Sequence, residues 1–598
     1  MITETPHLMT AQFRPVSWSA YRVSEDRAAI ILTDSDVPIV VDTALIDILT
    51  LCGTCRSLDD HADSIVRAGC AHGDRTTIRE HLQYCVQLGL LAPLNRPGGP
   101  VVSSSALPHS PITTIAIATA GRPVLLARCL GSLHEHCRRS GSRPRLLIVD
   151  GSGRAEDETA NRSIARRHEQ HGAVGPITFI GHAERDSIRD VMADALPQHD
   201  VDGGLALASS DYSLGASRNL ILLLTAGEKL LLLDDDVIVS PWALSDADDR
   251  LTLHGHGDPR VAAFFLDRVS AFAAVSATDV SLLAAHERLL GRTLSSLYEA
   301  AGDDIDVSHG CSHLLDAATS SDTRSHVRWT LSGVAGDAAI YCPYQRLFAR
   351  GPVREQLGGG RASCDTALTT REVVEAVARP TVAHSSQCIG YCMGLDNRTM
   401  VPPFTPYWRN SDGVFGTSLL VCDPGSFPGY VPVGILHDSA RPSRYREVMP
   451  SARQIRVSEL LSVLIRLWPS STIAHTPDVR LRRLGQYLLD LATLPAPQFS
   501  HLATLVMMDH LSGALRDAAD QLAAGKHAEH VASPLRAYCA TLMSHLQQPR
   551  FFVPVEYATG GGWESVQAYV RRVGAVFASW PDIWQCARTR LRDATFVL

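Results

Sequence analysis

The sequence lacks the features that direct a chain into a membrane or onto nucleic acid. Residues 1–12 are polar and contain no apolar core, so we expect no signal peptide. The longest apolar runs are interrupted by 227–229 or by Asp234, which excludes a membrane-spanning helix and predicts no integral membrane segment. The net charge of −8 argues against a basic surface, so nucleic acid is not an expected partner.

A disulfide framework is also missing. The 14 cysteines are scattered without a regular spacing, which is typical of free thiols in a cytoplasmic protein. Cys52 and Cys55 form one CxxC pair, but no second pair follows at zinc-finger spacing. A hydrophobic content of 45% and a charged content of 20% are ordinary for a soluble globular protein, and 598 residues are enough for three or four domains.

Three consecutive carboxylates end one of the most apolar stretches of the chain. Leucines at 230–233 precede Asp234, Asp235 and Asp236, and 237–239 are apolar again, which predicts a buried strand that surfaces at the triplet. Because the three acids repel one another, we expect a compensating cation. A hard divalent ion (Mn²⁺ or Mg²⁺) that holds a diphosphate is the usual one. The alternative is a loop whose acids are solvated.

The residues before the triplet suggest a family. GASRN at 215–219 suits a helix start near an anion, and AGE at 226–228 suits the end of that helix. The order GASRN, AGE, LLLDDD resembles the nucleotide-sugar domain of family 2 glycosyltransferases, which have an α/β, Rossmann-like GT-A fold and a DxD motif. The resemblance implies that Asp234 faces the ribose and, with Asp236, the metal, and that Arg218 lies near the diphosphate or its ribose. Each of these side chains could instead be a helix cap or part of an ion pair.

Two earlier segments extend the resemblance. Strand-like stretches at 112–119 and 145–150 flank a helical pattern at 124–137, which predicts parallel strands with ligands at their carboxyl ends. TIAIATAGRP (114–123) and LLIVDGSG (146–153) resemble the first two motifs of the family, which implies that Thr119, Arg122 and Asp150 line the nucleotide pocket. The second acid of the usual VDDGS pattern is missing after Asp150, and an ordinary turn is the alternative there.

Later segments supply two more candidates. PPFTPYWRNSDGVFG (402–416) resembles the acidic segment in which a carboxylate deprotonates the acceptor, which implies that Asp412 is the catalytic base; a helix N-cap is the alternative. The apolar stretch 431–436 ends at His437, and many GT-A enzymes complete their metal site with a late histidine; the alternative is a core histidine. Residues 333–337 predict a tight acidic turn before a strand at 339–342.

The first 97 residues form a separate pattern. Strands at 21–23, 28–32 and 37–41 and helices at 42–51, 57–68 and 74–88 predict a winged-helix unit. IVVDTALIDILTLCGTCRSLDD (39–60) and LQYCVQLGLL (82–91) resemble PqqD-like domains, which bind the leader of a ribosomally made peptide as an added strand. The resemblance implies a groove between 29–32 and 76–88. A structural role and DNA binding are the alternatives.

These patterns divide the chain into a PqqD-like unit (1–97), a linker (98–110), a GT-A domain (111–445) and a helical domain (446–598) with amphipathic stretches at 458–468, 479–493, 497–523, 534–547 and 563–587. The layout is similar to that of mycofactocin-system glycosyltransferases. It predicts a metal-dependent, inverting glycosyltransferase (EC 2.4) that moves a sugar from a UDP- or GDP-sugar to a ribosomal precursor peptide or peptide-derived acceptor recognised through its leader. The alternatives are a polysaccharide or glycolipid transferase, and a non-catalytic scaffold with a degenerate transferase fold.

Overall fold

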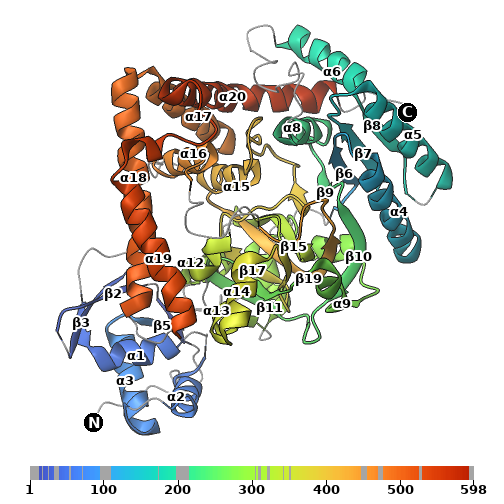
Figure 1. Ribbon diagram of the computed structural model, residues 1–598. Helices are drawn as coiled ribbons and strands as arrows, with labels where there is room; N and C mark the ends of the chain where they lie inside the picture. The colour runs from blue at the N-terminus through green and yellow to red at the C-terminus, as the bar shows by residue number, and fades with distance from the viewer. Residues whose placement is uncertain are drawn as a thin grey trace.

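The computed structural model describes residues 13–16, 18–24, 26–32, 39–52, 56–69, 72–93, 110–172, 174–196, 214–302, 305–307, 311–319, 324–340, 343–348, 352–445, 454–468, 476–523 and 528–591. The expected linker at 98–110, apart from its last residue, and Cys55 of the CxxC pair lie outside these ranges. Figure 1 shows a large sheet with helices on both sides, a group of long helices (α16–α20) along one flank and a small N-terminal unit at one corner.

The first half of the central region alternates strands and helices, as expected. Its elements are β6 (Thr114–Thr119), α4 (Pro123–Ser140), β7 (Arg145–Asp150), α5 (Ala155–His171), β8 (Ile177–Ile180), α6 (His182–Ala195), α8 (Leu214–Leu224) and β9 (Lys229–Asp234). The strands are parallel in the order β8-β7-β6-β9. Their side chains are buried on both faces, which explains the continuous apolar runs in the sequence. The predicted α/β architecture is confirmed.

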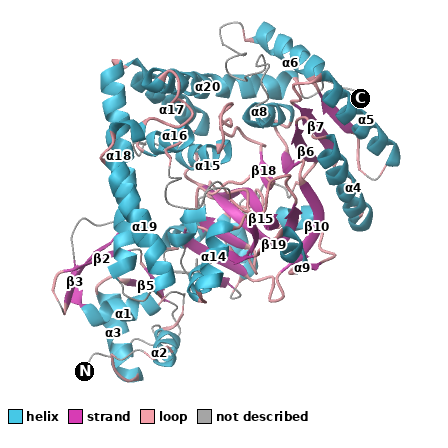
Figure 2. Ribbon diagram, in the orientation of Figure 1, coloured by secondary structure: helices cyan, strands magenta, loops and turns pink. Residues whose placement is uncertain are grey.

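The second half adds mostly antiparallel pairings to the same sheet (Figure 2). Its elements are β10 (Val237–Ala243), β11 (Leu251–His256), β12 (Val261–Phe264), α9 (Arg268–Ala273), β13 (Ser276–Ala277), α10 (Leu282–Glu287), α11 (Leu294–Ala301), β14 (Ile305–Val307), α12 (Ser312–Thr319), β15 (His326–Asp337), the 3-10 helix η2 (Pro343–Phe348), α13 (Pro352–Gly358), α14 (Arg361–Thr369), β16 (Glu372–Ala376), β17 (Thr381–His384), β18 (Cys392–Asp396), α15 (Ser411–Cys422) and β19 (Ser426–His437). β18 joins the two halves, because it pairs with β9 on one side and with β15 on the other.

The expected tight turn at 333–337 is wrong. These residues are the last part of β15, which continues to Asp337 and pairs with β16 and β19 along this stretch. Ala339 and Ile340, the described part of the strand expected at 339–342, are not in a strand.

The N-terminal unit has its own hydrophobic core. It consists of β1 (Phe13–Pro15), β2 (Trp18–Arg22), β3 (Arg27–Leu32), β4 (Ile39–Asp42), α1 (Thr43–Leu51), α2 (Leu58–Arg67), α3 (Arg75–Gln87) and β5 (Leu91–Pro93). Strand β3 is the middle strand of the sheet β2-β3-β4, paired with both neighbours. The groove expected between 29–32 and 76–88 therefore cannot take up a leader as a strand paired with Ala29 or Ile30, because both edges of β3 are already paired there.

The C-terminal region is helical, as expected. It contains α16 (Val457–Arg466), α17 (Pro477–Thr493), α18 (Ala496–Ala523), α19 (Glu529–Leu546), the 3-10 helix η3 (Pro549–Phe552) and α20 (Gly562–Arg590). One hydrophobic core runs from these helices to the sheet through α8 and α15, so this region packs on the central region as an extension of its core. In the described part of the chain, no helix combines the length and the apolar character needed to cross a membrane.

Candidate functional site

The acidic triplet lies where the parallel strand order reverses. The chain moves outward from β6 to β7 and β8 and then returns to form β9 on the other side of β6, with Ala118 opposite Asp234. Such a reversal opens a crevice at the carboxyl ends of the strands, where open α/β sheets bind ligands. The sequence analysis also placed the candidate residues at this edge, because ligands bind at the carboxyl ends of parallel strands.

Thr119 and Arg122 contact the triplet directly. The Thr119 hydroxyl at the end of β6 donates a hydrogen bond of 2.7 Å to Oδ2 of Asp235, whose side chain is buried. Arg122, in the loop after β6, places Nη1 3.2 Å from Oδ1 of Asp235 and 3.2 Å from Oδ2 of Asp236. Its side chain is 39% exposed.

Strand pairing brings His437 to Asp236. β10 starts directly after the triplet and runs antiparallel to β19, which puts Val237 opposite His437. His437 Nε2 lies 3.1 Å from Asp236 Oδ1, and Nδ1 donates to the backbone oxygen of Asp337 at 2.6 Å. The ring of Tyr391 stacks on the imidazole at a centroid distance of 5.7 Å. These contacts fix the ring with Nε2 directed at the triplet.

The Asp236–His437 pair is charged in the described state. Burial alone would lower the pKa of His437, but the hydrogen bond and charge of Asp236 outweigh it and raise the pKa to about 9. Burial would likewise raise the pKa of Asp236, but the hydrogen bond from His437 holds it at about 2. At neutral pH the proton is therefore on His437, and Asp236 is a carboxylate.

Arg218 connects the triplet to Asp412. This arginine of α8 is 2% exposed; Nη2 lies 2.9 Å from Asp234 Oδ1, and Nη1 forms an ion pair with Asp412 Oδ1. The backbone N–H of Gly390 donates to Asp412 Oδ2 at 2.9 Å. A Cβ atom at Gly390 would lie 1.8 Å from Arg218 Nη2, so only glycine leaves room for the guanidinium here. Asp412 stands in the first turn of α15, after the N-cap residue Asn410. Its carboxylate contacts Arg218, the backbone N–H of Gly390 and the Ser411 hydroxyl.

The remaining carboxyl groups are perturbed by burial and by one another. Burial raises the pKa of Asp235 to about 7, against the opposing charge of Arg122. The pKa of Asp234 is raised because burial and the like charges of Asp236 and Asp412 together outweigh Arg218. Burial alone would lower the pKa of Arg218, but its two carboxylate partners hold it above the usual range.

The structure changes the reasoning about charge at the triplet. Arg122, Arg218 and His437 already supply cations to the carboxylates, so repulsion within the triplet does not by itself require a metal ion. Among the described residues, no group of three His, Cys, Asp or Glu side chains is arranged to hold a metal ion.

Asp236 and His437 are the two side chains here that could hold a divalent cation. Asp236 Oδ1 and His437 Nε2 lie 3.1 Å apart as a hydrogen bond, so a cation has to displace the proton on Nε2 before both atoms can ligate it. A carboxylate oxygen and an imidazole nitrogen together suit Mn²⁺. Asp234, the third predicted ligand, is instead paired with Arg218 through Oδ1.

Asp150 has a different environment from the other predicted residues. Its side chain is fully buried and accepts from Ser152 N at 2.7 Å, Ser152 Oγ at 2.5 Å and Asn161 Nδ2 at 2.9 Å. Ser152 Oγ in turn accepts from Gly121 N at 2.8 Å. Asp150 therefore joins the loop after β7 to the loop after β6, and it shapes the crevice without facing it.

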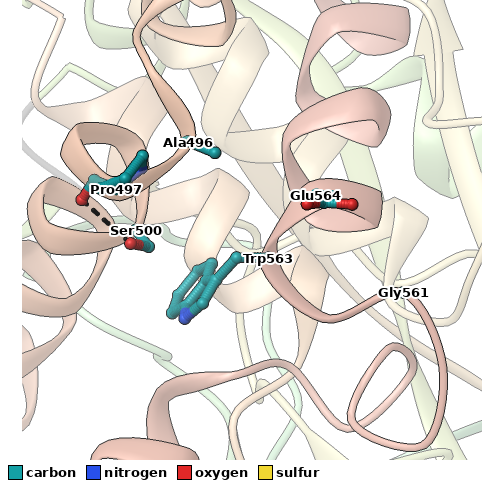
Figure 3. A pocket seen from close by; sticks show the side chains of 6 residues that line it. All are labelled: Ala496, Pro497, Ser500, Gly561, Trp563 and Glu564. Carbon is teal, nitrogen blue, oxygen red and sulfur yellow. Dashed lines mark hydrogen bonds between the residues drawn. The ribbon is translucent and has the colours of Figure 1, made fainter.

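Gly390 and Tyr391 were missed in the sequence. They lie just before β18, within a segment that contains no charged residue or familiar motif, so no local signal identified them. Asp235 was part of the recognised triplet, but its bond with Thr119 follows only from the register of β6 and β9. A depression on the helical region, drawn in Figure 3, is lined by Ala496, Pro497 and Ser500 of α18 and by Gly561, Trp563 and Glu564 at the start of α20, and includes none of the site residues.

Comparisons with known proteins give little support for any assignment of family or function. A scan against protein-family models finds no match, and a search of curated proteins finds none. Among solved structures, the chain is similar to the mannosyltransferase PcManGT from Pyrobaculum calidifontis, solved in complex with GDP-Man and Mn²⁺. The two are 13% identical, and the match covers 88% of this chain and 99% of that chain with a TM-score of 0.25. A TM-score of this size does not establish a shared fold.

Proposed function

We propose that the protein is a metal-dependent glycosyltransferase that moves a sugar from a nucleotide-sugar to an acceptor hydroxyl. One observation carries the proposal: at the strand-order reversal, Asp236 and His437 lie 3.1 Å apart, and Arg218 joins the same triplet to Asp412. This combines a pair of groups suited to a divalent cation with a separate carboxylate that can accept a proton. A cluster that only stabilised the fold would not need Asp412, a partly exposed acid, as a second partner of Arg218.

Each side chain has a role in this scheme. Asp236 and His437 hold the divalent cation, which when bound neutralises charge on the diphosphate leaving group. Arg122 lies beside them with its side chain 39% exposed, and it donates to a phosphate oxygen. Asp234 and the loop shaped by Asp150 border the nucleotide.

Asp412 is the proposed base. The acceptor oxygen forms a bond to the anomeric carbon while the bond from that carbon to the diphosphate oxygen breaks, and the acceptor proton passes to Asp412. A single displacement of this kind inverts the anomeric centre. Asp412 is 22% exposed at its side chain, and Gly390 and Arg218 fix its orientation while an oxygen lone pair remains for the acceptor. Arg218 is a positioning residue.

Metal-dependent donor turnover tests the proposal. The protein is incubated with Mn²⁺ or Mg²⁺ and a panel of UDP- and GDP-sugars, and the released diphosphate is measured. We expect slow hydrolysis of one donor that chelation abolishes. His437→Ala should raise the Mn²⁺ concentration needed for half-activity, with a smaller effect at saturating Mn²⁺. His182→Ala, which removes an exposed histidine on α6, is the matched control. No metal-dependent release with any donor would favour the scaffold alternative.

The acceptor in this proposal is a ribosomal peptide or a peptide-derived molecule held through its leader by the N-terminal unit. A separate hydrophobic core supports an independent binding module. Among the described strands, β4 pairs only with β3, so its outer edge can receive a peptide strand, and Val40 on it is 56% exposed. Arg75 and Arg79 of α3 pair with Asp59 and Asp63 of α2, which argues against a basic DNA-binding face.

A further inference from the structure

Two exposed arginines stand near the proposed site in the chain without a role in it. Arg409 lies three residues before Asp412, and Arg441 lies four residues after His437. Within the described part of the chain, neither guanidinium forms a hydrogen bond or an ion pair; the contacts of Arg441 go through its backbone N–H and its carbonyl oxygen. Both therefore keep their full set of side-chain donors.

Arg441 belongs to the segment that follows β19 and packs beside Asp337. Arg371 Nη2 lies 2.8 Å from Asp337 Oδ1, and the Ser439 hydroxyl donates to Asp337 Oδ2. Ser439 Oγ in turn accepts from the backbone N–H of Arg441 at 3.3 Å. These bonds hold the backbone of Arg441 next to the Arg371–Asp337 ion pair.

Arg409 is placed from the other side by the helical region. The indole N–H of Trp408 donates to the Tyr557 hydroxyl at 2.9 Å, and the two rings meet edge to face at 5.5 Å. The residue before Tyr557 is Glu556, which pairs with Arg456 Nη1 at 3.3 Å. Adjacent residues of the chain therefore hold Arg456 and the neighbour of Arg409.

Positive charge is in excess where these segments meet. Partial burial lowers the pKa of Arg409, and three nearby guanidinium groups lower it further: those of Arg441, Arg371 and Arg456. Asp337 opposes this effect, but it is already paired with Arg371. Arg456 also has a carboxylate partner, so Arg409 and Arg441 contribute like charges that only a bound anion would balance.

The backbone around Arg409 is strained. Trp408 has a φ of 70° and Asn410 a φ of 68°, so residues with a Cβ atom adopt the left-handed conformation on both sides of Arg409. This conformation is unusual for a bulky residue, and it persists where the surroundings impose it, often at binding sites. The bond from Trp408 to Tyr557 is such a constraint, and it fixes the path of the chain at Arg409.

We propose that Arg409 and Arg441 bind an oxyanion, a phosphate or carboxylate group, carried by a substrate of the proposed transfer. The planar guanidinium presents paired N–H donors that match the oxygens of both groups. Because Arg409 leads into the helical turn that carries Asp412, we expect the acceptor to carry the oxyanion; the diphosphate of the donor is the other source of the same chemistry. The assignment to a substrate rests on the proposed function, whereas the binding of an oxyanion does not.

Titration with inorganic phosphate tests the proposal. The full-length protein is titrated by calorimetry at constant ionic strength with a chelator present, so that no metal ion contributes. We expect the dissociation constant to rise at least about tenfold when Arg409→Gln and Arg441→Gln are combined, because each change removes a charged donor. Both side chains are exposed, so the circular dichroism spectrum should not change. Arg166→Gln removes an exposed arginine of α5 and is the matched control, with phosphate binding as in the wild type.

Titration with UDP and with GDP in the presence of Mn²⁺ distinguishes the two sources. Unchanged nucleotide affinity in the double variant assigns the oxyanion to the acceptor, and a loss as large as that for phosphate assigns it to the donor. The proposal is wrong if the wild type does not bind phosphate, if the double variant binds it equally well, or if Arg166→Gln loses as much. Phosphate binding requires neither a metal ion nor turnover, so its outcome is separate from that of the donor-turnover experiment.

Discussion

Arg218 offers the sharpest test of how the site is held together. The substitution Arg218→Met keeps most of the side-chain volume and removes the charge that Asp234 and Asp412 share. Breaking a buried ion pair by removing one partner costs roughly 3–5 kcal/mol, because the remaining charge is left uncompensated. The two carboxylates are 26% and 22% exposed, so water screens them in part, and we expect about 3 kcal/mol, at the low end of that range.

The pH dependence of the variant has a defined sign. Without Arg218, burial and the neighbouring negative charges raise the pKa of Asp234 further above the unfolded value of 3.8. A carboxyl group with a raised folded pKa destabilises the protein when it is ionised, and the penalty disappears as it takes up a proton. Arg218→Met should therefore recover part of its lost stability as the pH falls from 7 to 5.

Urea unfolding at constant pH measures both effects, with the m-value as a check that the same surface is exposed. The control is Arg218→Met combined with Asp234→Asn and Asp412→Asn, which removes all three charges and should be more stable than the single variant. A loss below about 1 kcal/mol for Arg218→Met, or a triple variant no more stable than the single one, would refute the view that Arg218 is held by its two carboxylates.

Four further predictions concern activity and stability. Asp236→Ala should abolish metal-dependent donor turnover while the circular dichroism spectrum is unchanged; wild-type turnover would contradict its role. Asp412→Asn should keep donor and metal binding but slow transfer by roughly 10²-fold or more, measured as kcat at saturating donor; equal loss of both would indicate a structural role. Deleting 1–97, or Val40→Asp on the β4 edge, should raise the KM for precursor peptide and leave donor hydrolysis intact, and an unchanged KM would remove the peptide as acceptor. Fully buried His286 has its pKa lowered by burial from 6.5 to about 3, so the unfolded state binds its proton first as the pH falls below 6.5. The free energy of unfolding should therefore be lower by roughly 2 kcal/mol at pH 5 than above pH 6.5. This loss should be absent in His286→Gln.

The elements with strong local patterns were predictable from the sequence. The parallel strands β6, β7 and β9 are buried on both faces, so each appears as an apolar run that ends in polar residues. The helices of the C-terminal region were located to within a few residues. Asp234, Asp236, Arg218 and Asp412 were named as candidates because the segments around them resemble motifs of family 2 glycosyltransferases.

What could not be predicted depends on contacts between distant segments. Gly333 and Gly336 suggested a turn, yet both lie in β15, where neighbouring strands approach closely. A Cβ atom at Gly333 would lie 2.8 Å from Ala376 Cβ, and Gly336 has a φ of 111° with His437 O 2.3 Å from its Cβ position. In such places glycine permits close packing of strands, and the local sequence gives the same signal as a turn.

The partners of the charged side chains could not be predicted from the local sequence either. Local sequence indicated that Asp236 and Asp412 were candidates, but not that Asp236 accepts a hydrogen bond from His437 or that Asp412 shares Arg218 with Asp234. Those partners are set by the register of β10 against β19 and by the packing of α8 against the segment before α15. The local sequence likewise did not show that β3 is the central strand of its sheet, paired with β4 as well as with β2.

The helical C-terminal region has a physical relation to Asp412 that its sequence left open. Residues 397–410 join β18 to α15 without regular structure, so neighbouring groups have to fix their path. Two indoles of α20 do so: Trp584 Nε1 donates to Asn397 Oδ1 at 3.0 Å, and Trp580 Nε1 donates to Val401 O at 2.7 Å. Both tryptophans are buried, and each bond engages a polar group of a loop that would otherwise need water. Because a catalytic carboxylate must be held to within about 0.5 Å, these bonds from the helical region order the segment that leads to Asp412, the proposed base.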